Sequence, residues 1–179
     1  MKDKSFILKG LSLKNNQTII DLGAGDGVVV FEAAYESLQK KLNTKFIALE
    51  INPVLIIVLY LNWMLHPNRK HVKIVWGDMF KISYASLVID SVSHSFPASA
   101  RPTKNPSELR AVGIPGMTAT YHNDLTFYLY ISPWLIEKVI SAIQKQLPQS
   151  RFVSYYYPIK SMAKKEVILK GIHNTYLYN

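Results

Sequence analysis

The chain has 179 residues, of which 49% are hydrophobic and 18% charged, so it is long and apolar enough for one globular domain and is not a disordered chain. It contains no cysteine, which excludes disulfides, cysteine zinc sites and cysteine nucleophiles and is compatible with a reducing, cytoplasmic compartment. The formal net charge of +9 favours an acidic partner, nucleic acid or an anionic membrane, or serves solubility alone.

The start of the chain carries no targeting signal that the sequence pattern would reveal. The first ten residues, MKDKSFILKG, lack the long apolar core and the cleavage site of a signal peptide. The longest apolar run, PVLIIVLYLNWML at Pro53–Leu65, is shorter than the ~18–20 residues that cross a bilayer. We therefore expect a cytoplasmic protein without a membrane span.

Strands and helices are predicted to alternate along the chain, which is typical of a parallel sheet with helices on both faces. Two of the helices are predicted to begin with a proline in their first turn. A closing pair of strands indicates an antiparallel edge. The predicted elements are strand Thr18–Leu22, helix Gly27–Lys41, strand Lys45–Glu50, helix Pro53–Leu65, strand Val72–Trp76, strand Leu125–Tyr130, helix Pro133–Gln146, strand Arg151–Tyr157 and strands Glu166–Leu169 and Thr175–Tyr178.

The stretch Val88–Asp124 interrupts this alternation and is rich in Pro, Ser, Thr and Ala. A connection this long is expected to be functional or poorly ordered. A short helix is predicted within it at Pro106–Val112, with Asn105 as its cap. We therefore predict a single domain over residues 1–179 with an atypical loop insert at about residues 88–124.

The sequence DLGAGDG, residues 21–27, follows a buried strand and opens a helix, an arrangement that binds nucleotide-like ligands. A dinucleotide fingerprint would need its third glycine at position 28, where this chain has Val28. Asp26 would repel a phosphate at the start of the helix, and no P-loop lysine follows. The bend therefore favours a ligand that carries adenosine but no phosphate.

Three acidic residues are predicted at the carboxyl ends of three successive strands, the edge at which such sheets bind ligands. Asp21 and Asp26 can face the cationic end of S-adenosylmethionine. Glu50 can accept both ribose hydroxyls, Asp78 can accept the adenine amino group, and Met79 can pack on the ring. Each acid alone is compatible with an ordinary turn or strand end, and it is their combination that indicates this cofactor.

The motifs DLGAGDG, IALEINP and VWGDMF resemble the first three motifs of the class I, Rossmann-like S-adenosylmethionine-dependent methyltransferases. The resemblance covers most of the chain outside the insert. It implies a three-layer α/β sandwich with a mostly parallel seven-stranded sheet, an antiparallel last strand, and S-adenosyl-L-homocysteine as the product. It also implies that the cofactor is bound by Asp21, Gly23, Ala24, Gly25, Asp26, Gly27, Glu50, Ile51, Asp78 and Met79.

A narrower resemblance is to the small protein-lysine methyltransferases, namely the broad-specificity archaeal enzymes and the mitochondrial enzymes that modify membrane carriers and the ATP synthase ring. It is carried by DLGAGDG, LTFYLYISPWLIEKVISAIQKQLPQSRFVSYYYPI and the closing HNTYLYN. It implies a protein lysine as acceptor, with Tyr130, Ser132 and Pro133 beside the methyl-transfer position. The chain departs from this family in its short segment before the first strand and in the insert, which has no counterpart there.

A lysine acceptor must lose a proton before methyl transfer, because its free pKa is about 10.4. A dry aromatic pocket would lower that pKa, and Tyr128, Tyr130 and Trp134 are candidates for its lining, although core packing is the commoner role for any one of them. The Asn/Asp-Pro-Pro-Tyr turn of enzymes that methylate adenine or glutamine is absent, which counts against a nucleobase amine. The histidines show no spacing that indicates a metal site.

The predicted helix Pro53–Leu65 is apolar on every side, with Asn62 its one clearly polar residue and Tyr60 partly so. Such a helix is expected to be buried against something. The candidates are the insert, a second subunit in a homo-oligomer, and peripheral contact with a membrane surface, which the charge of +9 would assist.

Two alternatives to a protein-lysine methyltransferase stay open. A methyltransferase of RNA or of a small molecule would draw on the basic charge, and would show a contiguous Lys/Arg stripe beside the cofactor edge. A non-enzymatic scaffold with a degenerate cofactor cleft would show that cleft filled by the chain itself.

Overall fold

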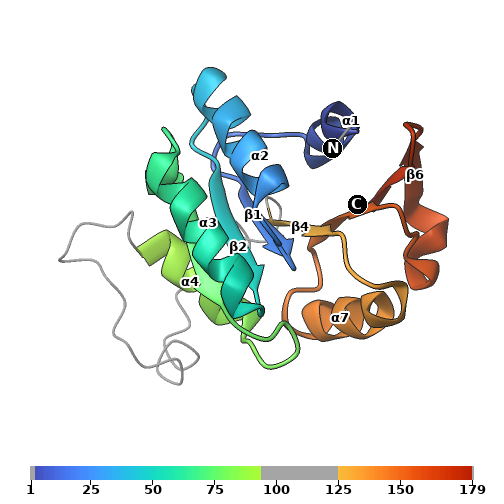
Figure 1. The fold of residues 1–179 in the computed structure, drawn as a ribbon. Coiled ribbons are helices and arrows are strands. Elements are labelled where there is room, and N and C mark those ends of the chain that lie inside the picture. The colour runs from blue at the N-terminus through green and yellow to red at the C-terminus, as the bar shows by residue number, and fades with distance from the viewer. Residues whose placement is uncertain (1–2, 94–124, 179) are drawn as a thin grey trace, which may run out of the picture.

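The apolar runs of the sequence form one seven-stranded sheet in the computed structural model, which describes residues 3–93 and 125–178 (Figure 1). The strand order is β3-β2-β1-β4-β5-β7-β6. The central strands β1 and β4 are buried on both faces, as their nearly continuous apolar sequences predict. The strands are β1 (Thr18–Leu22), β2 (Lys45–Glu50), β3 (Val72–Trp76), β4 (Leu125–Leu129), β5 (Arg151–Tyr155), β6 (Glu166–Leu169) and β7 (Thr175–Tyr178).

Strands β1 to β5 run parallel, whereas β7 is antiparallel to both β5 and β6. This arrangement confirms the predicted mostly parallel sheet with an antiparallel edge. In register, Asp21 of β1 lies between Ala48 of β2 and Tyr128 of β4, so these three side chains share one face of the sheet.

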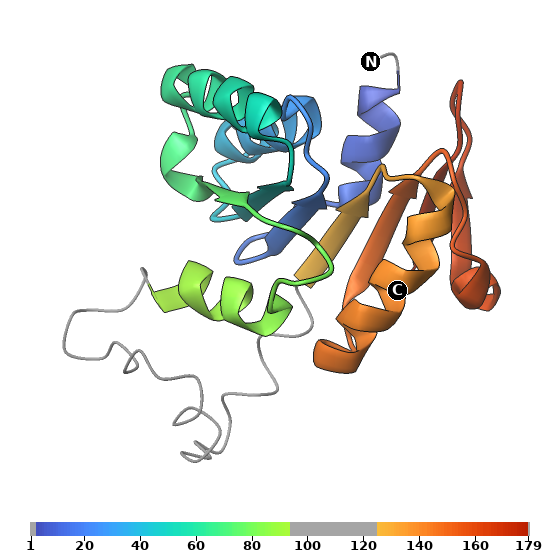
Figure 2. The same ribbon diagram turned by 60° about the horizontal axis from the view of Figure 1, so that its bottom comes forward.

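Helices cover both faces of the sheet and make three layers (Figure 2). One face packs against α1 (Lys4–Leu11), α2 (Val28–Gln39) and α3 (Pro53–Leu65), and the other against α4 (Tyr84–Ser93) and α7 (Pro133–Gln146). Short 3₁₀ helices η1 (Arg69–His71) and η3 (Lys160–Lys165) lie in connections. Among the residues that the structure describes, none of the helices is both long and apolar enough to cross a membrane.

Most predicted bounds are confirmed, and three elements end earlier than predicted, two of them for a backbone reason. The helix predicted at 27–41 is Val28–Gln39, because Gly27 and Lys41 have positive φ angles of 81° and 55°. The strand predicted to continue to residue 157 ends at Tyr155, since Tyr156 has a φ of 76°. The strand predicted to reach residue 130 ends one residue earlier.

Helix α4 continues to Ser93, so it includes the first residues of the stretch predicted as the insert. Tyr84, Leu87 and Val88 are buried in the core cluster that includes residues of α7, so the start of the predicted stretch, at Val88, belongs to a packed helix and not to a loop. Residues 94–124, with the short helix predicted at Pro106–Val112, lie outside the described residues.

Helix α1 has no counterpart among the predicted elements, and tertiary contacts hold it in place. Ile7 and Leu11 are fully buried, and Gly10 lies so close to the sheet that a Cβ there would come within 3.3 Å of side chains of β5 and β7. Before the helix, the buried Asp3 carboxylate accepts hydrogen bonds from the backbone N–H of residues 172 and 173 and from the Tyr155 hydroxyl, at 2.8–3.0 Å. These bonds tie the chain start to the turn between β6 and β7.

We predict that Asp3→Asn lowers the melting temperature by several degrees at neutral pH, because one amide oxygen cannot serve three donors. The N–H of His173 is the largest factor that lowers the pKa of Asp3 below its ordinary 3.8. A lowered folded pKa contributes stability above pH 3.8 that is lost as the pH falls through the folded value. The deficit of the variant should therefore shrink in strongly acidic solution.

Thermal unfolding followed by circular dichroism between pH 3 and pH 7 checks this expectation. Glu36→Gln, which changes a carboxylate on the surface of α2, is the matched control and should leave the melting temperature nearly unchanged. A deficit for Asp3→Asn that stays the same at every pH would show that its charge has no part in the docking of α1.

Candidate active site

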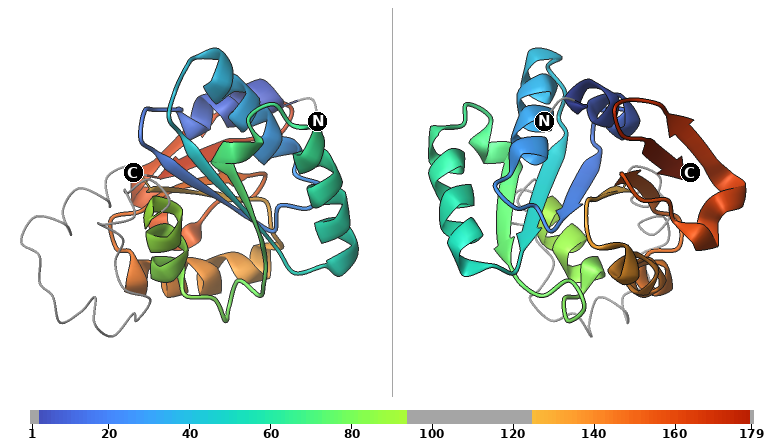
Figure 3. Two further views of the ribbon diagram at one scale, coloured as in Figure 1. Left: turned by 90° about the vertical axis from the view of Figure 1, so that its left-hand side faces the viewer. Right: turned by 45° about the vertical axis from the view of Figure 1, so that its right-hand side comes forward.

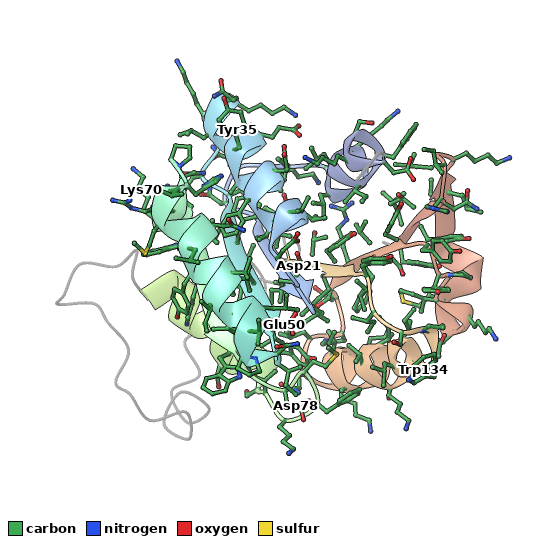
Figure 4. All side chains as sticks on the ribbon, viewed as in Figure 1. Asp21, Tyr35, Glu50, Lys70, Asp78 and Trp134 are labelled. Carbon is green, nitrogen blue, oxygen red and sulfur yellow. The ribbon has the colours of Figure 1, made fainter. Side chains whose placement is uncertain are left out.

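The three acids that the sequence singles out follow three neighbouring parallel strands. Asp21 lies in β1, Glu50 ends β2, and Asp78 follows the end of β3 by two residues. Because the carboxyl ends of parallel strands share one edge, they lie along that edge, in a row from β1 to the loop after β3 in Figure 4. The charge of Glu50 acts on the pKa of Asp21, which shows that these two are neighbours.

The loop between β1 and α2 requires its glycines. Gly23, Gly25 and Gly27 all have positive φ angles, of 73°, 59° and 81°. A Cβ at Gly27 would come within 2.5 Å of Phe31 and 2.6 Å of Leu59, so α2 and α3 could not pack there. At Gly25, no heavy atom of the described residues outside 24–26 lies within 4 Å of the Cβ position, so the space above it is open for a ligand.

Glu50 holds this loop from the end of β2. Its carboxylate accepts hydrogen bonds from the backbone N–H of Gly25 at 2.8 Å and of Ile51 and Asn52 at 2.9 Å each. The predicted role, in which Glu50 accepts both ribose hydroxyls, stays a prediction, and these bonds limit the oxygens that can serve it. Oε2 has one protein donor and can accept one more hydrogen bond, whereas Oε1 already has two.

The other predicted side chains have local roles beside the ligand position. Asp26 is exposed and accepts from the Val28 N–H at 3.2 Å, which helps to begin α2. One oxygen of Asp78 accepts a hydrogen bond from the Phe80 N–H at 2.9 Å. Its second oxygen lies 3.9 Å from the ammonium of Lys81. The Met79 methyl lies 3.9 Å from the Cβ position of Gly23, so the structure brings the first and third motifs together.

The remaining predicted residues of the first two motifs lie in the same two loops. Ala24 is buried, and its N–H, like that of Gly23, donates to the carbonyl of Leu49 in β2 at 2.9–3.0 Å. The Ile51 side chain is 54% exposed and faces away from the core. Cofactor contact by these residues stays a prediction.

Two polar groups are buried side by side beneath the glycine loop. Asp21 and Tyr128 lie in register on adjacent strands and are 3% and 2% exposed. Burial, followed by the charges of Glu50 and Asp26, raises the pKa of Asp21 to about 8. Burial and the charge of Asp21 raise the pKa of Tyr128, so its hydroxyl stays protonated. This hydroxyl has no hydrogen-bond partner within the described residues, although buried polar groups nearly always have one.

Aromatic side chains gather where β4 and β5 end. The Tyr130 ring is 53% exposed and makes an edge-to-face contact with Tyr155, at 5.2 Å between ring centroids. Tyr155 and Tyr156 both contact His173, at 6.0 and 4.6 Å. We call Tyr130, Tyr155, Tyr156 and His173 the aromatic cluster. It lies at the same edge of the sheet as the three acids.

The residues predicted for the acceptor side lie close together in the chain around the start of α7, and their role stays a prediction. Helix α7 begins at Pro133, three residues after Tyr130, with Ser132 at the N-cap position, and the Ser132 side chain makes no capping hydrogen bond. Trp134 is 74% exposed on the first turn of α7 (Figure 4). Tyr128 cannot line an acceptor pocket as predicted, because it points into the face covered by α1 and α2.

The sequence reasoning missed three residues that the structure brings to this edge: Tyr155, Tyr156 and His173. The signal that could have identified the tyrosines is YYY at residues 155–157, at the end of a predicted strand. Nothing comparable marks His173, which reaches the cluster only because β7 folds back beside β5.

No protein-family model matches the sequence, and no curated protein matches it. Solved structures do match the fold. An RNA methyltransferase from Salinibacter ruber in complex with S-adenosyl-L-homocysteine is 16% identical with a TM-score of 0.64, over 97% of this chain and 86% of that one. A precorrin-6y C5,15-methyltransferase from Geobacter metallireducens is 15% identical with a TM-score of 0.56, over 97% and 84%.

A third match is TrmK from M. capricolum in complex with S-adenosyl-homocysteine, at 10% identity and a TM-score of 0.52, over 97% of this chain and 66% of that one. Likeness at this level of identity concerns the fold alone. The chain therefore has the Rossmann-like fold of the class I methyltransferases, as its motifs predicted.

The raised pKa of Asp21 gives a testable pH dependence. Because folded Asp21 keeps its proton to about pH 8 whereas an unfolded Asp loses it near pH 3.8, stability should fall as the pH rises across this window. Asparagine carries no such proton. We predict that the melting temperature of Asp21→Asn, relative to that of the wild type, increases steadily from pH 5 to pH 8.

Differential scanning calorimetry in the absence of ligand measures this difference. Glu137→Gln changes a carboxylate that accepts from two backbone N–H groups on the outer side of α7, and serves as the control without such a trend. If the difference in melting temperature between Asp21→Asn and the wild type did not change with pH, the protonated state assigned to Asp21 would be contradicted.

Proposed function

We propose that this protein is an S-adenosylmethionine-dependent methyltransferase whose cofactor lies over the glycine loop at the carboxyl edge of β1, β2 and β4. The observation that carries this proposal is the open space above Gly25, bordered by Glu50 and lying over the buried pair Asp21 and Tyr128. A tightly held loop with an open upper side and an unpartnered polar group is a place for a ligand.

The charges at this edge match the cofactor. S-adenosylmethionine supplies a methyl group on a positively charged sulfur and carries a second cation, its ammonium group. Asp21, Asp26, Glu50 and Asp78 place carboxyl groups around the position, and an acid that titrates near pH 8 gains from a nearby cation. The spare acceptor position of Glu50 suits ribose, and the second oxygen of Asp78, which accepts no backbone hydrogen bond, suits adenine.

Proteins of the same fold support the choice of cofactor. Those from Salinibacter ruber and M. capricolum were solved with S-adenosylhomocysteine, the product of methyl transfer from this cofactor. The scaffold alternative is not favoured, because it predicts a cleft filled by the chain itself, whereas no described atom outside residues 24–26 lies within 4 Å of the Cβ position of Gly25.

For the methyl acceptor, we propose the side-chain amine of a protein lysine. The segments that follow β4 and β5, residues 130–134 and 156–160, contain four aromatic residues and one lysine. An aromatic surface of this kind attracts an alkylammonium ion by cation–π contact and then favours its neutral form as water is excluded. Tyr130, which is half exposed and held by Tyr155, is placed to orient the incoming amine.

This chain's contribution to the reaction is therefore positioning. In-line transfer needs the attacking nitrogen and the methyl carbon about 3–3.5 Å apart with water excluded. The glycine loop and the acids fix one partner, and Tyr130 with the start of α7 fixes the other. The proton of the amine leaves to solvent before the nitrogen attacks, so no side chain has to act as a strong base.

RNA is the second candidate acceptor. The net charge of +9 favours it, and two of the proteins of this fold are an RNA methyltransferase and TrmK. The predominance of aromatic over basic residues after β4 and β5 favours the lysine side chain, because contact with phosphates needs clustered cations.

Transfer of tritiated methyl from S-adenosylmethionine tests this assignment. We expect label in a lysine-rich protein, recovered as methyl-lysine after acid hydrolysis, and none in the same protein after its lysines have been acetylated or in bulk RNA. Tyr130→Ala should reduce the rate at least about tenfold while the affinity for the cofactor stays near that of the wild type, because one orienting contact is lost.

Tyr35→Ala is the matched control, since Tyr35 is 48% exposed at the far end of α2 from this edge (Figure 4). Its rate should equal that of the wild type. Label found only in RNA would replace lysine by RNA as the acceptor. A protein that binds the cofactor and labels neither would contradict both acceptors, and one that binds no cofactor would contradict the methyltransferase itself.

A further inference from the structure

Helix α3 has a whole face of large apolar side chains in solvent. Its inner side packs on the sheet through Ile56, Leu59 and Trp63. The residues on its opposite, outer side also recur at helical spacing, and they point away from the sheet. The helix runs along the outer edge of the molecule in both views of Figure 3. We call this outer side the α3 apolar face; its residues, each 56–87% exposed, are Val54, Ile57, Leu61, Met64 and Leu65.

The α3 apolar face continues past the start of the helix to the edge that carries the acids. Ile51 is 54% exposed there, and Trp76 is 68% exposed at the end of the edge strand β3. The indole N–H of Trp76 donates to the Ile51 carbonyl at 3.0 Å, which fixes the ring beside the helix start. A tryptophan at the rim of an apolar surface is typical of contact with the interface of a bilayer.

The segment that carries this face has basic residues and no acidic ones. Residues 51–77, which form α3, η1 and β3, contain no Asp or Glu. Arg69 and Lys70 are exposed beyond the carboxyl end of α3, and the Arg69 guanidinium donates to the Met64 carbonyl at 2.7 Å, which holds it at the end of the apolar face. In Figure 4, Lys70 lies at the opposite end of the helix from Glu50.

The apolar side chains and the basic residues together favour one kind of partner for the α3 apolar face. A second copy of the chain would bring the same segment, residues 51–77, which offers Arg69 and Lys70 no carboxylate of its own. Anionic lipid headgroups would supply that charge, and acyl chains would cover the apolar side chains. With 13 residues α3 is too short to span a bilayer and can only lie along its surface.

We propose that the α3 apolar face binds the surface of an anionic lipid bilayer. In this orientation the helix lies in the plane of the headgroups, with Trp76 and Ile51 at one end of the contact and Arg69 and Lys70 at the other. Glu50 immediately precedes the contact, so the carboxyl edge of the sheet borders the bilayer. The inference rests on the exposed face and its charges and is independent of methyl transfer.

Co-sedimentation of the full chain with lipid vesicles tests this proposal. We expect binding to vesicles of mixed phosphatidylcholine and phosphatidylserine, and weaker binding to phosphatidylcholine alone. The double variant Ile57→Gln/Leu61→Gln should bind at least about tenfold more weakly, because two apolar side chains no longer enter the bilayer. Arg69→Gln/Lys70→Gln should bind more weakly and lose most of the dependence on salt.

The control Val167→Gln/Ile172→Gln changes two apolar residues of similar exposure near the other end of the sheet and should bind as the wild type does. Circular dichroism of each variant confirms that it is folded, since all the altered side chains are exposed. Wild type that does not bind anionic vesicles, or Ile57→Gln/Leu61→Gln that binds normally, overturns the proposal. So does a dimer in light scattering that this double variant abolishes, because the occupant is then a second copy.

Discussion

A single carboxylate joins the loops on which the candidate site is built. Glu50 accepts from the backbone N–H of Gly25, Ile51 and Asn52, so it fixes the glycine loop after β1 and the turn after β2 at once. Asn52 in turn caps α3 by accepting from the Val54 N–H at 2.9 Å. The start of α3 and the open space above Gly25 therefore both depend on one glutamate side chain at the end of one strand.

This arrangement lowers the stability of the fold at the residues beneath the glycine loop. Asp21 and Tyr128 occupy positions where an apolar pair would pack better, and the Tyr128 hydroxyl has no partner among the described residues. Unsatisfied buried polar groups cost about 1–3 kcal/mol each. Such sites are typical of functional surfaces, where ligand binding and not stability determines the residue. The aromatic cluster and the α3 apolar face border the same edge, so ligand, acceptor and membrane contact would meet there.

The sequence predicts the sheet well, because its strands are short apolar runs bounded by turn residues, and it predicts the acids because parallel strands share an edge. Helix α1 was missed, since eight residues with an internal glycine form a helix only through the buried contacts of Ile7 and Leu11. The pairing of Asp21 with Tyr128 depends on strand order and register, which a local pattern does not contain. The apolar composition of α3 was visible in the sequence, but which face stays exposed was not.

Calorimetric titration with S-adenosylmethionine and S-adenosylhomocysteine tests the central claim most directly, on the wild type, Glu50→Gln and the control Glu137→Gln. Both ligands should bind the wild type and the control alike. Glu50→Gln should bind at least about tenfold more weakly, because an amide cannot accept from three backbone N–H groups and a ribose. Wild-type protein that releases no heat with either ligand, or equal affinity in a folded Glu50→Gln, would contradict a cofactor site at this edge.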